Sequence, residues 1–250
     1  MTHIAEAVVL MAGSGSRLRG SDQTFLKPFV PILGRPLVCY IIDALLGAGI
    51  NKINFIVGYQ SERMRAEMEK LAPPKPEWVF IENPHWQKQN GISLLAAANQ
   101  VSAPFLLTMS DHLFDHAIID LLIESADIDL LNLAVDRKID SVFDLDDAMK
   151  IQTHGDKVVA IGKNLPDYDA IDTGLFVCPE SIFDYLERAR SSSHRDDCAL
   201  ADGVRLVAAD GKVCAIDIGD AWWQDVDTPE MLLRAEEQMR NLPEVKRRMA

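Results

Sequence analysis

The sequence has few cysteines, no long apolar run and no excess of positive charge. Its four cysteines stand far apart without a C-x-x-C pair, which argues against a zinc site or a disulfide framework; they are Cys39, Cys178, Cys198 and Cys214. No apolar run reaches the roughly 18 residues of a membrane-spanning helix, and the amino terminus lacks a basic segment followed by a long apolar stretch. The chain has 25 basic and 38 acidic residues, a formal net charge of −13, which argues against nucleic acid or an anionic membrane as partner. These absences predict a soluble, cytoplasmic protein.

Two common nucleotide-binding motifs are also incomplete. Leu18 stands where a dinucleotide-binding fingerprint has its third glycine, which argues against a dehydrogenase. Gly15 and Gly20 have the spacing of a Walker loop, but Ser21 and Asp22 follow where that loop needs Lys and then Ser or Thr. Any nucleotide site in this chain must therefore be of another kind.

A different phosphate-binding pattern stands near the amino terminus, where an apolar run ends in VLMAGSGSRLRG and continues to Lys27-Pro28. Gly13 and Gly15 allow the backbone to approach a polyphosphate closely, and successive N–H groups can then face its oxygens. Arg17 and Lys27 supply a guanidinium fork and a compact cation. A Gly-Ser turn without function explains the glycines alone, but the two cations favour a nucleotide site, which we expect to include Met11, Ala12, Gly13, Ser14 and Gly15.

The periodicity predicts one α/β domain with a mixed, mostly parallel, Rossmann-like sheet and helices on both faces. A chain of 250 residues is long enough for such a domain. We expect a nucleotide-binding half at 1–112, an acceptor-binding half at 113–229, and a terminal helix and tail at 230–250. Helices are predicted at 37–46, at 62–71 after an N-cap at Ser61, and at 94–101, 179–190, 199–208 and 230–239; three prolines within 73–76 predict a rigid connector.

Polar residues follow two of the predicted elements. Asn90, Gly91 and Ser93 precede the helix expected at 94–101, where they could accept a base or a phosphate, although helix capping explains them equally well. Asp111 follows the strand expected at 105–109, at the edge where open α/β sheets bind ligands. Its carboxylate is the first candidate ligand for Mg²⁺, whereas His112 is more typical of an orienting or packing role.

The motifs together resemble a known family. The G-x-G-S-R loop with a downstream K-P is similar to the signature of nucleoside-triphosphate transferases. The segments N-G-I-S-L, L-T-M-S-D-H, I-G-K-N-L, D-T-G-L-F and D-V-D-T, in this order, resemble the inositol-1-phosphate cytidylyltransferase branch. Phosphonate cytidylyltransferase domains are also similar. The resemblance implies a nucleotide-diphospho-sugar transferase type of fold, and CTP, Mg²⁺ and a small phospho- or phosphono-alcohol as ligands.

The resemblance also assigns residues in the second half. It implies that Lys163 holds the phosphate of the acceptor and that Lys150 lies near the acceptor. Asp172 could accept hydrogen bonds from substrate hydroxyls, although a structural turn aspartate is the competing explanation. Asp225 and Asp227 point the same way in an extended segment and could share a cation with Asp111. The resemblance favours Asp227 as the direct ligand with Asp225 in support, while capping of the next helix is an alternative role for Asp227.

Several alternatives stay open. The acidic stretch at 136–147 is expected to be mobile and mostly solvated. Gln89 and Met149 depart from the inositol branch, where glycine and threonine are usual, so phosphocholine or a hydroxyalkyl phosphonate also fits as acceptor. A nucleotide sensor without catalysis is a further alternative, and the sequence leaves open whether the chain forms a homodimer. We expect alanine at Lys27 or Asp111 to reduce turnover far more than it alters folding.

Overall fold

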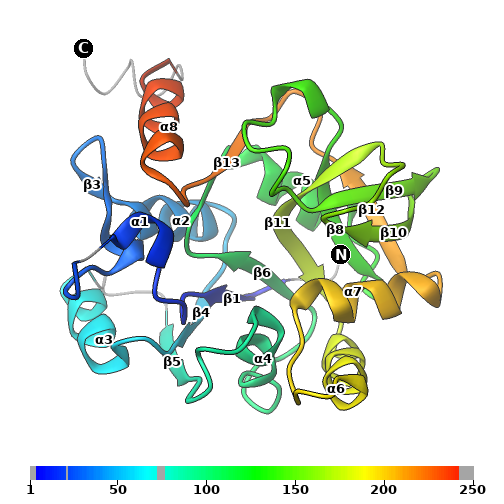
Figure 1. Cartoon of the computed structure of the whole chain (residues 1–250), viewed down its shortest axis with the longest axis horizontal. Coiled ribbons are helices and arrows are strands. Elements are labelled where there is room, and N and C mark those ends of the chain that lie inside the picture. Colours follow the sequence, from blue (N-terminus) through cyan, green and yellow to red (C-terminus); the bar gives the residue numbers. More distant parts are fainter. Residues whose placement is uncertain (1–3, 21, 72–76, 242–250) are drawn as a thin grey trace.

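The computed structural model describes residues 4–20, 22–71 and 77–241 (Figure 1). The predicted connector at 73–76 and residues 242–250 of the predicted terminal helix and tail lie outside this part of the chain. Within it, a single mixed sheet of nine strands forms the centre of the molecule. Its strand order is β5 (Glu77–Glu82), β4 (Lys52–Val57), β1 (Glu6–Leu10), β6 (Phe105–Met109), β11 (Ala170–Cys178), β8 (Leu131–Asp136), β12 (Val213–Asp217), β10 (Lys157–Gly162) and β9 (Lys150–His154).

The sheet divides into two regions of different topology. Strands β5, β4, β1 and β6 are all parallel. Strand β11 then runs antiparallel to both β6 and β8, β12 is parallel to β8, and β10 is antiparallel to β12 and β9. Because β11 reverses direction, its beginning lies at the same edge of the sheet as the carboxyl ends of β1 and β6. The predicted α/β fold is confirmed, with the antiparallel strands gathered in the second half.

Helices cover both faces of the sheet because its strands are apolar on both sides. In β1, Ala7 and Val9 face one buried cluster while Val8 and Leu10 face the other, as the two-residue repeat of a strand requires. Helices α2 (Leu37–Gly47), α3 (Ser61–Glu69) and α5 (Ala117–Ser125) pack on the first face, and α4 (Asn90–Leu95), α6 (Ile182–Ser192) and α7 (Leu200–Ala209) on the second.

A smaller cluster fixes the carboxyl-terminal helix over one end of the sheet. Helix α8 (Pro229–Asn241) buries Ala235 and Met239 against Ile32, Leu37 and Val226. The short elements nearby are β2 (Pro31–Ile32), β3 (Arg35–Pro36), β7 (His112–Phe114) and β13 (Trp223–Asp225), with the short helix α1 (Ser16–Arg19) and 3-10 turns at Lys27–Phe29 and Ile139–Ser141. Because β13 pairs with β7, the segment that follows β6 lies beside the segment that leads to α8.

Two local predictions were wrong. Helix α4 begins at Asn90, four residues before the expected start, so the polar residues form its first turn. Ser61 is the first residue of α3 after Gln60, which has a left-handed backbone, and its hydroxyl donates to Glu82. In the acidic stretch at 136–147, Asp136 is buried and accepts a hydrogen bond from the Trp223 indole, whereas the other four aspartates are exposed or partly exposed, as expected.

No helix in the described ranges is both long and apolar enough to span a membrane.

Candidate active site

The glycine loop and the segment after β6 border one cavity at the carboxyl edge of the parallel strands. The cavity has a volume of about 590 Å³. Gly13 leaves open space where a side chain would stand, and Gly15, at φ 60°, has Lys27 so close that a Cβ would lie 2.7 Å from that lysine's Cβ. The lining includes every loop residue predicted for the nucleotide; it runs from Leu10 to Arg17 and includes Lys27, Pro28, Trp86, Gln87, Asn90, Ser93, Met109, Ser110, Asp111, His112 and Asp227.

Lys27 lies between two carboxylates at the floor of this site. The residue is only 7% exposed, and its Nζ donates to Asp111 Oδ2 at 2.6 Å and also to Asp227 Oδ1. Burial alone would lower the pKa of Lys27, but the two aspartates raise it above its ordinary value. Burial opposes ionisation of Asp111, yet Lys27 and His112 hold the pKa of that carboxyl well below its usual range. Lys27 and Asp111 are therefore both charged at neutral pH.

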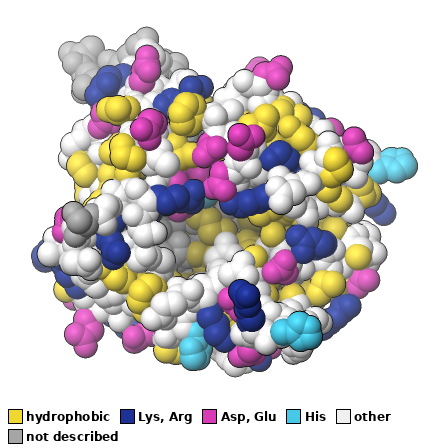
Figure 2. Space-filling model, viewed as in Figure 1, with side chains coloured by type: hydrophobic (Ala, Val, Ile, Leu, Met, Phe, Trp, Pro, Cys, Tyr) yellow, Lys and Arg dark blue, Asp and Glu magenta, His cyan; other side chains and the backbone are white. Residues whose placement is uncertain are grey.

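Arg17 connects the glycine loop to the opposite side of the cleft. Its Nη2 donates to Asp227 at 2.5 Å and its Nη1 to Asp147 at 2.7 Å. Asp147 lies on the turn before β9 and also accepts from Lys163, which follows β10. In Figure 2, Lys and Arg side chains and Asp and Glu side chains surround a hollow in the middle of the visible face. Charged groups from both regions of the sheet thus meet across the cleft.

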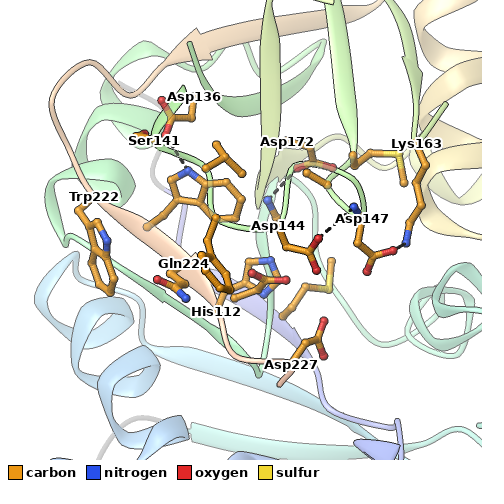
Figure 3. A pocket seen from close by; sticks show the side chains of 18 of the residues that line it. His112, Asp136, Ser141, Asp144, Asp147, Lys163, Asp172, Trp222, Gln224 and Asp227 are labelled. Atoms are coloured by element: carbon orange, nitrogen blue, oxygen red, sulfur yellow. Dashed lines mark hydrogen bonds and ion pairs between the residues drawn. The ribbon is translucent and has the colours of Figure 1, made fainter. Parts of the chain in front are cut away.

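A second cavity, of about 450 Å³, adjoins the first on the side of the antiparallel strands (Figure 3). Lys163, Asp144, Asp147, Asp172 and Asp225 line it together with Trp222 and Trp223. Burial raises the pKa of Asp172 to about 6, although the Gly174 N–H, 2.7 Å away, and nearby His112 favour the ionised form. Five residues border both cavities: Arg17, Asn90, Met109, His112 and Asp227. The arrangement can hold two ligands side by side.

His112 was expected to orient or pack, and its surroundings fit that role. Its Nδ1 lies 2.7 Å from Asp111 Oδ1, its ring stacks on Trp223, and the strand register pairs it with Asp225. A Cβ at Gly174 would lie 2.5 Å from His112 Nε2. The bulge in β11 and the left-handed Gly174 therefore make room for this ring, which gives the D-T-G segment a structural reason.

The comparisons with known proteins agree with this geometry. Residues 7–142 match the model of the MobA-like NTP transferase domain. The chain belongs to this family. It is therefore a nucleotidyltransferase.

Relatives of the transferase share most of its length. It is 34% identical over 237 residues to the "Bifunctional IPC transferase and DIPP synthase" of Thermococcus kodakarensis, covering 92% of this chain and 49% of that relative. Identity to the protein of the same name in Rubrobacter xylanophilus is 32% over 233 residues, covering 92% and 51%. The transferase thus spans about half the length of these curated relatives.

Solved structures agree on the fold. The inositol-1-phosphate CTP transferase from T. maritima superposes with a TM-score of 0.82 at 24% identity, covering 96% of this chain and 98% of that one. A UDP-glucose pyrophosphorylase from Acinetobacter baumannii superposes with a TM-score of 0.76 at 17% identity, covering 99% of each. The predicted nucleotide-diphospho-sugar transferase type of fold is confirmed.

The transferase presents two carboxylates suited to a hard cation. Asp111 and Asp227 converge on the ammonium of Lys27, so both oxygens already face one positive charge. Mg²⁺ takes few protein ligands and fills its shell with phosphate oxygens and water, and this pair fits it. The expected sharing of the cation by Asp111, Asp225 and Asp227 stays a prediction: in residues 4–20, 22–71 and 77–241, no three acidic, His or Cys side chains already form a group that could hold a metal ion. Asp225 instead lies beside His112, and burial raises its pKa.

Two of the residues predicted for ligands are occupied by structural contacts. Gly91 borders neither cavity of the transferase; a Cβ there would lie 2.6 Å from the Cys198 carbonyl oxygen. Lys150 is buried, and its Nζ donates to the carbonyls of Leu145 and Lys163, both at 2.8 Å. In the described structure Gly91 therefore serves packing and Lys150 holds the turn before β9, and their predicted ligand roles stay predictions.

Asn90 and Ser93 border the first cavity but also serve the fold. The Asn90 side-chain oxygen accepts from the Leu200 N–H at 2.8 Å and so ties α4 to α7. The Ser93 hydroxyl accepts from Asn83 Nδ2 at 3.0 Å. The sequence analysis missed Trp86 and Gln87, which line the same cavity. An aromatic residue within a polar loop at the sheet edge is the signal that could have indicated them.

Proposed function

We propose that the transferase joins CMP from CTP to a phospho-alcohol, with inositol 1-phosphate as the leading acceptor, and releases pyrophosphate. The observation that carries this proposal is the meeting of two cavities at Arg17, His112 and Asp227. One cavity has a glycine loop and cations for a triphosphate, and the other has Lys163 beside carboxylates that can accept from hydroxyls. The names of the relatives favour the same chemistry.

In this proposal the first half of the chain, 1–112, holds the nucleotide and 113–229 holds the acceptor. An oxygen of the acceptor's phosphate attacks the α-phosphorus of CTP in line; the new P–O bond forms as the bond to the β-phosphate breaks, and pyrophosphate leaves. Both reactants are already ionised, so catalysis consists of positioning two anions and offsetting their charge. Arg17 and Lys27 neutralise the leaving pyrophosphate, and Lys163 holds the acceptor.

Asp111 and Asp227 would hold the divalent metal ion that this family generally uses, and we propose Mg²⁺. When bound, the ion supplies charge neutralisation and orientation of the triphosphate. Displacement of Lys27 from these two carboxylates would leave its ammonium free to face the phosphates. Asp225 supports the pair indirectly by facing His112.

The acceptor cavity also contains one of the two departures from the inositol branch. Met149 lines it, where threonine is usual, and places a thioether rather than a hydroxyl there. Gln89 is absent from the lining of both cavities, and its N–H donates to Asp197 at 3.0 Å. The choice among inositol phosphate, phosphocholine and a hydroxyalkyl phosphonate therefore depends on the second cavity.

The test is pyrophosphate release with Mg²⁺, crossing the four nucleoside triphosphates against inositol 1-phosphate, phosphocholine, 2-hydroxyethylphosphonate and glucose 1-phosphate. Release with CTP and inositol 1-phosphate alone supports the proposal in full. Release with CTP and another acceptor keeps the cytidylyl transfer and changes the alcohol. CTP binding without release for every acceptor would favour a nucleotide sensor. Asp111→Asn serves as the inactive control and Asp129→Asn, on the exposed surface, as the matched charge control.

A further inference from the structure

Asp147 is held by two cations from opposite sides of the cleft. Its Oδ2 accepts from Arg17 at 2.7 Å, and its Oδ1 accepts from Lys163. Arg17 lies in the short helix α1, directly after the glycine loop, whereas Lys163 follows β10 in the antiparallel region. Figure 3 shows Asp147 beside Lys163 at the second cavity. One carboxylate therefore uses each of its oxygens on a different cation.

These two cations lie where the two ligands of the proposed reaction would meet. Arg17 borders both cavities and Lys163 lines the second, so an anion bound between them would lie where the cavities meet. A phosphate group binds such a pair through two of its oxygens, as a carboxylate does. The hydrogen bond from Lys163 and the charge of Arg17 also lower the pKa of Asp147, so the position holds an anion at neutral pH.

We propose that Asp147 occupies the place of the acceptor's phosphate in the ligand-free transferase and selects the anions that may replace it. This inference rests on the proposed function, in which Lys163 holds the acceptor, and it adds that Arg17 contacts the acceptor's phosphate besides the pyrophosphate. A phosphomonoester dianion carries more charge than a carboxylate and replaces Asp147. A monoanion of the size and charge of a carboxylate gains nothing over Asp147 and is rejected. Asp147 is thus a specificity-determining residue.

The exchange is easy because the pairs are exposed. The side chains of Arg17, Asp147 and Lys163 are 53%, 37% and 49% exposed, and ion pairs of that kind contribute little to stability. Asp147 lies on the turn between Ser141 and β9, which is anchored independently by Lys150. Its carboxylate can therefore leave the two cations without loss of the surrounding structure.

The neighbouring residue offers a matched control. Asp146 is exposed, borders neither cavity, and forms no ion pair in the described part of the chain. Asn at position 146 changes the net charge as much as Asn at position 147 does, one residue away. Any general effect of charge on anion binding is therefore measured by Asp146→Asn.

The experiment is binding of inorganic phosphate, followed by ³¹P NMR without metal or nucleotide, to wild type, Asp147→Asn, Asp146→Asn and the double variant Asp147→Asn/Lys163→Met. We expect Asp147→Asn to bind phosphate about three- to tenfold more tightly than Asp146→Asn, as the loss of weak competing pairs allows, and the double variant to lose this gain. Acetate, a monoanion, should bind detectably only when Asp147 is replaced. Equal binding by the two single variants, or a gain that persists without Lys163, would overturn the proposal.

Circular dichroism confirms that each variant is folded, and Asp147→Ser replaces Asp147→Asn if the amide disturbs the turn. The measurement involves neither CTP nor an alcohol, so it is independent of the pyrophosphate assay. If Asp147→Asn gains phosphate affinity but the transferase releases no pyrophosphate, the proposed function is contradicted and the anion site is kept. If pyrophosphate is released but Asp147→Asn gains no phosphate affinity, the proposed function is kept and the role of Asp147 is contradicted.

Discussion

Two lysines proposed to face phosphates lie in contrasting surroundings. Lys27, on the nucleotide side, is buried between Asp111 and Asp227, whereas Lys163, on the acceptor side, is half exposed and paired with Asp147. The nucleotide side is built from backbone and buried charges at the ends of parallel strands. The acceptor side is built from side chains on turns. The first is therefore fixed before ligands arrive, and the second is held by contacts that exchange readily.

The largest effect is expected at Asp111. Asp111→Asn keeps the shape of the side chain but removes the charge that faces Lys27 and the proposed metal ion. We expect pyrophosphate release to fall by at least about 100-fold, the size of effect seen when a preorganised electrostatic group is removed. Exposed Asp129→Asn should leave release unchanged. If Asp111→Asn kept more than a tenth of wild-type turnover, the proposed role of the Asp111 carboxylate in holding Lys27 and the metal ion would be contradicted.

The two lysines themselves provide the second test. Lys27→Met leaves Asp111 and Asp227 facing each other without the buried ammonium between them, although Arg17 still donates to Asp227. This change should lower the free energy of unfolding by about 3–5 kcal/mol. Lys163→Met removes an exposed pair and should cost about 1 kcal/mol or less. The expectation that replacing Lys27 reduces turnover far more than it alters folding stays a prediction, and the burial of Lys27 adds a measurable cost to folding. Urea unfolding in EDTA measures both losses.

Added metal sharpens the same comparison. Mg²⁺ or Mn²⁺ should restore part of the stability of Lys27→Met, because the ion can take the place of the ammonium between Asp111 and Asp227. Wild type and Lys163→Met should gain less. Similar losses of unfolding free energy in the two lysine variants would contradict the claim that the nucleotide side is held by buried charges. No response of Lys27→Met to either ion would contradict the proposal that Asp111 and Asp227 hold the metal ion.

Two glycines from the predicted nucleotide set should respond in opposite ways. Gly91→Ala places a Cβ 2.6 Å from the Cys198 carbonyl oxygen and should destabilise the fold by about 1–3 kcal/mol. Gly13→Ala meets no protein atom within 4 Å and should leave stability almost unchanged, but it should raise the KM for CTP because the methyl group stands in the cavity. Thermal unfolding and steady-state kinetics distinguish the two. If Gly13→Ala and Gly91→Ala lost stability equally, the assignment of Gly13 to the nucleotide cavity and of Gly91 to packing would be contradicted.

The predictable part of the site is the part determined by local sequence. A strand followed by Gly13, Gly15 and Arg17 can only deliver a turn at a sheet edge, and the strand before Asp111 is a continuous apolar run. Their meeting follows from parallel pairing of β1 with β6. The alternation of strands and helices was enough to predict this half of the fold.

The rest depends on contacts between residues far apart in the chain. The sequence does not show that the Lys150 ammonium donates to backbone carbonyls, or that Gly91 packs against residues of the connection before α7. It also does not show that Asp136, in an acidic stretch, is buried beneath Trp223. Each of these depends on antiparallel pairing and on turns whose paths the local pattern leaves undetermined. The acceptor side was therefore predicted mainly through resemblance.

The smallest effect tests the acceptor side through pH. Burial raises the pKa of Asp172 from 3.8 in its ordinary state to about 6 in the folded chain. The folded state therefore binds this proton more tightly than the unfolded state. Its contribution to stability is complete below about pH 3.8 and is lost as the pH rises through about 6. Ionised Asp172 thus destabilises the fold at neutral pH.

Asp172→Asn removes this titration. Relative to wild type, the variant should gain stability as the pH rises from 4.5 to 7.5, by about 2 kcal/mol, which follows from a shift of this size. Asp147→Asn is the control of opposite sign, because the pKa of Asp147 is lowered and its pairs strengthen as it ionises. Urea unfolding at several pH values measures both. A gain for Asp172→Asn that does not depend on pH would mean that this carboxyl is solvated like those of the exposed turn. The inference that Asp172 is a buried acid of the acceptor cavity would then be wrong. A gain that rises with pH means that water solvates the Asp172 carboxylate poorly in this cavity. A substrate hydroxyl can then donate the hydrogen bond that water does not supply.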